Sequence, residues 1–233
     1  MDIQDVTALL AVYAIIAASL ALSIHVKRTG GRLDSRKIVH VGVGFFVFVW
    51  WAFSEGWIML AFFVVPFAIL LFIAMFDGNM ISSSDLGEIS NGMGHRTGLL
   101  LYVLSIGILI VFFFDNHWTA ATIGVVAMTF GDAAGSIIGR RFGRHAVVGN
   151  KTAEGSLAVL VSTSLAAGAV IAIYGWLASC GLYDGCTDPL IPAPLCCIIA
   201  GAVSSVVEML CPGQLDNIAN PLAVAASMAL LGL

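Results

Sequence analysis

The sequence predicts an all-α integral membrane protein, a polytopic bundle of about eight transmembrane helices. Of its 233 residues, 60% are hydrophobic and only 10% are charged, whereas a soluble domain has roughly a quarter of its residues charged. The mean hydropathy is +1.01. One helix needs about 20 apolar residues to cross the hydrocarbon core, so eight spans leave room only for short loops. We therefore expect residues 1–233 to form a single membrane domain.

Eight apolar segments follow one another along the chain. The first lacks the positive leading region of a signal peptide, so we expect it to be retained as a helix. The second and third are separated only by residues 54–56, which predicts a tight turn. No segment shows the alternation of a barrel strand, and helices are the other structure that satisfies the backbone in lipid. The segments are residues 6–25, 38–54, 57–76, 98–114, 118–139, 156–179, 189–210 and 218–233.

The basic residues predict the orientation, because short cytoplasmic loops are enriched in Lys and Arg. With eight spans, all ten Lys and Arg residues fall on one side of the membrane. The loops of the other side contain acidic residues but no Lys or Arg. We expect both termini outside and the basic loops in the cytoplasm. The ten residues are Lys27, Arg28, Arg32, Arg36, Lys37, Arg96, Arg140, Arg141, Arg144 and Lys151.

Several classes of function are disfavoured by the sequence. No basic face with interleaved aromatic residues suggests a nucleic-acid partner. The five cysteines fit no zinc pattern; free thiols are the default, with a Cys180–Cys186 disulfide as the alternative in an oxidising compartment. A small transporter would need polar residues distributed through its spans, and few ionisable residues lie at mid-membrane here. The oligomeric state is left open.

The fifth segment combines glycine spacing with an acidic residue. Glycines recur every four residues from Gly131 to Gly139, which predicts a face where another helix packs closely. Asp132 is followed by Ser136 and Arg140 at helical spacing, so these three share a face. An ionisable residue inside a span costs about 2.5–3.5 kcal/mol on insertion scales and is a functional-site hypothesis. The alternative is a structural carboxylate neutralised by Arg140.

The loop after this segment predicts a phosphate-bearing ligand. Arg and Lys side chains, backbone N–H groups exposed at glycines and a helix N-terminus all bind phosphate oxygens. Cytoplasmic topology alone explains the cations, but not the glycines or the polar residues among them. The candidate contacts are Arg96, Gly139, Arg140, Arg141, Gly143, Arg144, Asn150, Lys151 and Thr152.

Further carboxylates suggest a metal site. Mg²⁺ usually binds a few carboxylates together with substrate phosphates, and the candidate ligands are Asp132, Glu154, Glu208, Asp216 and Asn217. The alternative for Asp216-Asn217 is an ordinary turn. At the start of the second segment, Arg36, Lys37 and His40 are further candidates, the alternatives being topology signals and a helix-end histidine.

At these residues the chain resembles the membrane-embedded, CTP-dependent lipid kinases, a group that includes dolichol, phytol and farnesol kinases. The shared pattern is an Asp in a small-residue helix (Asp132), then Gly-Arg-Arg-Phe-Gly-Arg-His from Gly139, then Asn-Lys-Thr-x-Glu-Gly-Ser from Asn150. Weaker matches lie on both sides, at Arg36-Lys37 with His40, at His95-Arg96-Thr97, and at Glu208 with Asp216-Asn217.

The resemblance implies a reaction: the γ-phosphoryl group of CTP passes, with Mg²⁺, to the hydroxyl of an isoprenoid alcohol at the cytoplasmic face. Phytol, geranylgeraniol, farnesol and polyprenol or dolichol are the acceptors that it allows. Asp132, Lys151 and Glu154 would be the catalytic residues. The alternatives are a CTP-dependent diacylglycerol kinase and CDP-lipid synthesis by a phosphatidate cytidylyltransferase. The cytidylyltransferases end in a signature with Lys and Arg, and neither follows Lys151 here.

Overall fold

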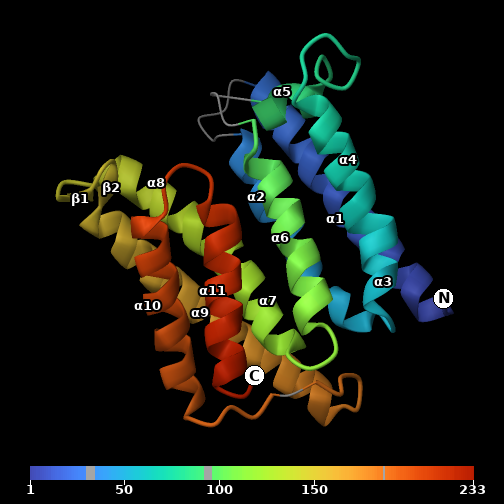
Figure 1. Ribbon diagram of the computed structural model, residues 1–233, viewed down its shortest axis with the longest axis vertical. Helices are drawn as coiled ribbons and strands as arrows, with labels where there is room; N and C mark the ends of the chain where they lie inside the picture. Colours follow the sequence, from blue (N-terminus) through green and yellow to red (C-terminus); the bar gives the residue numbers. More distant parts are fainter. Residues whose placement is uncertain (30–34, 92–95, 186) are drawn as a thin grey trace. The chain divides into compact units, whose positions relative to one another are not determined.

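Each apolar segment predicted from the sequence contains a helix in the computed structural model, which confirms the all-α membrane-bundle class (Figure 1). The structure describes all residues except 30–34, 92–95 and 186, and it leaves out the side chain of Arg36. One half of the cysteine pair considered above, Cys186, is therefore outside the described residues. Contacts within the chain divide it into two units, Met1–Ile110 and Val111–Leu233. Each unit is described by itself.

The first unit consists of long apolar helices and one short polar helix. α1 (Ile3–Arg28) is followed by α2 (Ser35–Gly44), which continues in two 3₁₀ turns, Phe45–Phe48 and Trp50–Ala52. α3 (Gly56–Met59) passes through a π-helical turn, Leu60–Val64, into α4 (Val65–Ala74). α5 (Asp85–Asn91) lies in the polar segment before α6 (Gly98–Phe113), whose last turn passes into the second unit.

Hydrogen bonds and ion pairs connect the ends of α1 to other parts of the first unit. Asp5, fully buried near the start of α1, accepts a 2.8 Å hydrogen bond from the backbone N–H of Ser54 and others from its hydroxyl. At the other end of α1, Arg28 forms a 3.0 Å ion pair with Asp85 of α5. An acidic residue at one end and a basic one at the other match the segregation of charge seen in the sequence.

The second unit contains four long helical segments and one hairpin. α7 (Trp118–Val126), a π-helical turn (Ala127–Gly131) and α8 (Asp132–Phe142) form one continuous span. The antiparallel strands β1 (Ala146–Val148) and β2 (Lys151–Thr152) follow. α9 (Ala153–Ser179), α10 (Ala193–Leu210) and α11 (Asp216–Leu230) complete the unit.

Length and composition identify the membrane spans. Within the described residues, five helical segments are long and apolar enough to cross a membrane: 3–28, 56–74, 118–142, 153–179 and 193–210. Two shorter apolar helices, 37–52 and 98–113, lie between them. These seven and α11 correspond one to one with the eight predicted segments. Which side of the membrane the termini occupy stays a prediction.

The glycines of the span 118–142 bring α8 directly against α9, as their spacing predicted. A Cβ added at Gly131 would lie 2.5 Å from Thr163 Oγ1, and one added at Gly135 would overlap Val159 Cγ2. From the other side, a Cβ at Gly155 would lie 3.0 Å from the carbonyl oxygen of Gly135. Small residues thus allow two backbones to pack closely inside the membrane, where packing rather than the hydrophobic effect holds helices together.

Replacing Gly135 by Ala is expected to lower the stability of the protein. The added methyl overlaps Val159, and overpacking of a tight core costs about 1–3 kcal/mol. Thermal unfolding of the purified protein in detergent measures the effect. The matched control is Gly175→Ala in α9, where no heavy atom lies within 4 Å of the added Cβ; this variant should unfold at or above the wild-type temperature because Ala favours helix. Equal unfolding temperatures for the two variants would contradict the packing role.

Candidate functional site

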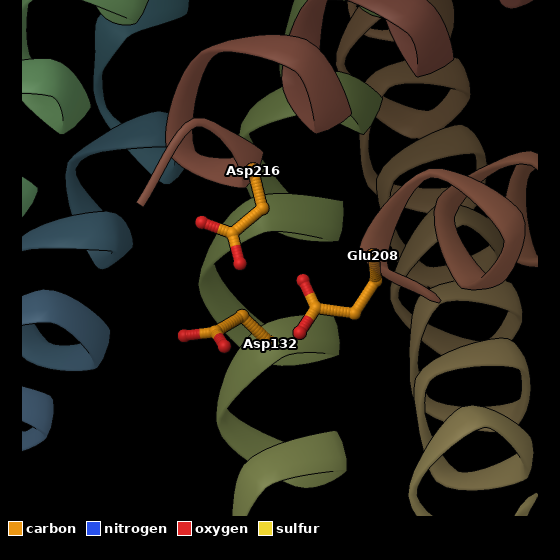
Figure 2. A group of neighbouring side chains, drawn as sticks. All are labelled: Asp132, Glu208 and Asp216. Atoms are coloured by element: carbon orange, nitrogen blue, oxygen red, sulfur yellow. The ribbon is translucent and has the colours of Figure 1, made fainter. Parts of the chain in front are cut away.

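Three carboxylates from three helices meet in the second unit. Asp132 is the first residue of α8, Glu208 lies in the last turn of α10, and Asp216 is the first residue of α11. One oxygen from each lies within 4.8 Å of the others. Figure 2 shows the three side chains facing one another. We call Asp132, Glu208 and Asp216 the carboxylate cluster.

The backbone brings these residues together by local means. The π-helical turn Ala127–Gly131 ends immediately before Asp132, and such turns change the face that the following residues present and are frequent at functional sites. Glu208 and Asp216 lie close to each other because only five residues, 211–215, connect α10 to α11. Two of the three carboxylates are therefore positioned by helix ends and one by an irregularity within a span.

Lys151 provides positive charge at the cluster. Its Nζ contacts Glu208 Oε1 and lies 3.7 Å from Asp216 Oδ2. Burial lowers the pKa of Lys151, but the charges of Glu208, Asp216 and Asp132 together outweigh burial, so its pKa is raised and the side chain stays an ammonium ion. The Lys151 ammonium thus lies beside the carboxylate cluster.

Glu208 is the most enclosed member of the cluster. The residue is only 6% exposed, and its Oε2 accepts no hydrogen bond from the described part of the chain. A buried carboxylate oxygen without a donor is costly unless a ligand completes its environment. The donor atoms are all oxygens, which is the set that Mg²⁺ prefers. The cluster therefore fits a magnesium ion chemically, with Asp132, Glu208 and Asp216 as its protein ligands.

Glu154, a fourth predicted metal ligand, has a different environment. Its carboxylate contacts His145 Nδ1 at 2.7 Å and accepts a 3.1 Å hydrogen bond from the backbone N–H of Arg144. Among the described residues it is not part of the group that can share a metal ion. Glu154 connects the start of α9 to the loop before β1 and so holds the hairpin. Asn217, the remaining predicted ligand, follows Asp216 in the first turn of α11.

Two glycines predicted to contact phosphate, Gly139 and Gly143, pack against Thr152. A Cβ at Gly139 would lie 3.2 Å from Thr152 Oγ1, and one at Gly143 would lie 2.7 Å from Thr152 Cγ2. Thr152 also caps α9, its hydroxyl accepting a 3.2 Å hydrogen bond from the N–H of Gly155. The hairpin turn itself is Gly149-Asn150, and Gly149 has a φ of +54°, a conformation that glycine adopts without strain. These residues set the position of Lys151 on β2.

The predicted basic contacts are dispersed. Arg140 donates hydrogen bonds to Ser136, to its hydroxyl at 3.0 Å and to its carbonyl at 3.2 Å, so their shared face is confirmed. Arg141 lies 5.3 Å from the ring centroid of Phe142, and Arg144 is exposed. The cation beside the carboxylate cluster is thus Lys151, whereas the guanidinium of Arg140 is bonded to its own helix.

The remaining candidates belong to the first unit. Arg96 forms a 3.0 Å ion pair with Asp77, near the end of α4. His40 is buried, with its ring centroid 4.2 Å from that of Tyr102. Lys37 lies in the first turns of α2, and of Arg36 only the backbone is described. Within the first unit Arg96 thus has an ion-pair partner and His40 an aromatic neighbour.

Asn220 is a candidate that sequence reasoning missed. It is 1% exposed, and neither atom of its side-chain amide has a hydrogen-bond partner among the described residues. It lies four residues after Asp216 in α11, so the two occupy one face of that helix. A polar residue one turn after an acidic one, at the start of an apolar segment, was the available signal.

Comparisons with known proteins give two relatives. A protein named phytol kinase from Synechocystis sp. is 33% identical over 138 residues, which are 56% of this chain and 55% of that protein. A protein named probable phytol kinase, chloroplastic, from Triticum aestivum is 29% identical over 202 residues, 81% of this chain and 64% of that protein. No family model matches the chain, and no solved structure matches it significantly.

The two matches cover most of the chain but only part of each relative. The chain spans 55% of the length of one and 64% of the length of the other. The longer match covers 81% of the chain, more than either unit alone contains. The chain is thus similar to one protein named phytol kinase and to one named probable phytol kinase.

Proposed function

We propose that this protein is a membrane kinase that transfers the γ-phosphoryl group of CTP to the hydroxyl of an isoprenoid alcohol. The observation that carries the proposal is the carboxylate cluster with Lys151 beside it. Phosphoryl transfer depends mainly on positioning and charge neutralisation, and acidic metal ligands beside a lysine are the residues it needs. The alcohol acceptor is supported by the two relatives named phytol kinase. The choice of CTP rests on the sequence motifs.

The residues of the site divide the work of this reaction. Asp132, Glu208 and Asp216 would hold Mg²⁺, which would neutralise charge on the triphosphate oxygens. Lys151 would contact the phosphates as a point charge. The alcohol oxygen attacks the γ-phosphorus, the bond from that phosphorus to the β–γ bridging oxygen breaks, and the hydroxyl proton passes to the carboxylate of Asp132. The products are CDP and a prenyl monophosphate. The basic loops favour the cytoplasmic face for this chemistry.

Asn220 would be a hydrogen-bond partner for the hydroxyl of the acceptor alcohol. α11 begins at Asp216, so Asn220 lies about 6 Å further along the helix, toward the apolar part of the span. A hydroxyl group both donates and accepts hydrogen bonds, and a carboxamide offers both kinds of atom. An alcohol that enters from the bilayer would reach this residue on its way to the carboxylate cluster.

The direct test is purified protein in lipid nanodiscs with Mg²⁺, a panel of lipid alcohols, and CTP labelled at either the α or the γ phosphate. We expect the γ label, and not the α label, on an isoprenoid alcohol, and weaker transfer from ATP. An α label on the lipid with release of pyrophosphate would identify a cytidylyltransferase and reject the kinase. A γ label on diacylglycerol alone would reject the isoprenoid acceptor.

Replacing Asp132 by Asn should abolish most of this activity while the helix stays intact. The loss of one charged group that acts on the transition state typically costs about 100-fold or more in rate. Initial rates with saturating CTP and alcohol measure the effect. The matched control is Asp115→Asn, an exposed aspartate that begins no helix. Equal rates for the two variants would show that Asp132 takes no part in the reaction.

Replacing Asn220 by Leu should raise stability and lower activity. A buried amide without partners costs about 1–3 kcal/mol, which the apolar side chain recovers. The thermal midpoint should therefore rise, while the KM for the alcohol increases and the KM for CTP stays the same. A lower midpoint with unchanged kinetics would show that Asn220 is structural and contacts no substrate.

A further inference from the structure

Lys151 lies against two of the three carboxylates that a divalent cation would use. Its Nζ contacts Glu208 Oε1 and lies 3.7 Å from Asp216 Oδ2. The charge of Asp132, the third member of the cluster, also acts on it. A metal ion bound by all three carboxylates would share Glu208 and Asp216 with this ammonium group. Like charges this close repel strongly where water is scarce.

The position of Lys151 allows it to leave these oxygens. It lies on β2, a strand of only two residues, next to the exposed turn Gly149-Asn150. Its side chain is 36% exposed, whereas that of Glu208 is only 7% exposed. Lysine carries its charge on a flexible four-carbon stem. The ammonium can therefore rotate toward solvent while the carboxylates stay in place on their helices.

A triphosphate offers the ammonium an alternative partner. Phosphate oxygens carry negative charge and attract a lysine that has been displaced from Glu208. The metal ion and the phosphate group would then each favour the binding of the other: the metal displaces the lysine, and the phosphate accepts it. Such a coupling is reciprocal, so each ligand must raise the affinity for the other by the same factor.

We propose that Lys151 couples the two ligands, so that the carboxylate cluster takes up a divalent cation poorly by itself and well together with a nucleotide triphosphate. This rests on the proposed function, because the cluster must be the metal–nucleotide site. Lys151 is then more than a phosphate contact: it excludes a lone metal ion and makes the metal–nucleotide complex the preferred ligand.

Titration with Mn²⁺, followed by the electron paramagnetic resonance signal of the free ion, tests the coupling without any turnover. The samples are the wild-type protein and Lys151→Met, with and without a non-hydrolysable CTP analogue, corrected for Mn²⁺ bound to the analogue. Without nucleotide, Lys151→Met should bind Mn²⁺ about tenfold more tightly than the wild type, within the usual range of coupling between sites. The analogue should tighten Mn²⁺ binding in both proteins, because its phosphates also bind the ion, and by a larger factor in the wild type than in the variant.

Two further variants complete the experiment. Lys27→Met is the matched control. In the first unit, Lys27 contacts Glu88 and lies 3.8 Å from Asp85, so it also faces two carboxylates. The Lys27→Met variant should bind Mn²⁺ as tightly as the wild type. Lys151→Gln repeats the charge removal with a polar side chain in case the methionine disturbs folding.

Unchanged or weaker Mn²⁺ binding by both Lys151 variants, with wild-type thermal midpoints, would overturn the coupling. Failure of the proposed function would appear separately, as a wild-type protein that phosphorylates no alcohol.

Discussion

Mutual repulsion among three carboxylates inside an apolar helical bundle is the constraint on which the second unit depends. Charged groups are expensive in a membrane unless partners surround them. Lys151 contacts Glu208 and lies near Asp216, so its ammonium offsets part of the charge of the cluster. The gathering of acidic oxygens from three helices is what makes the cluster suited to a divalent cation, and tight packing of the helices is what keeps the oxygens together.

The contacts that pack the helices therefore also position the charged groups of the site. The glycine face of the span 118–142 holds α8 against α9, which fixes Asp132 at the start of α8. Where α9 begins, Thr152 packs on Gly143 and caps the helix, so the hairpin that carries Lys151 is attached to both helices. A change in helix spacing would move the carboxylate of α8 and the lysine of β2 together.

Much of this arrangement follows from sequence, because ionisable residues in apolar segments have few structural explanations. Asp132, Glu208 and Asp216 were predicted as metal ligands, and the structure brings them together. Glu154 was predicted as a further metal ligand, and the structure shows it bonded to the hairpin loop. Spacing could not reveal this, because the position of Glu154 depends on a short hairpin with no periodic pattern. The orphaned amide of Asn220 was missed for a related reason: hydrogen-bond satisfaction is a property of tertiary packing.

The most direct test of this account is to locate the metal ion. Crystals grown with Mn²⁺ and a non-hydrolysable CTP analogue would show the ion by its anomalous scattering. The account predicts one peak bounded by oxygens of Asp132, Glu208 and Asp216, at metal–oxygen distances of about 2.0–2.2 Å, with the Lys151 ammonium turned toward phosphate. A peak at Glu154, or phosphates bound away from the three carboxylates, would contradict it.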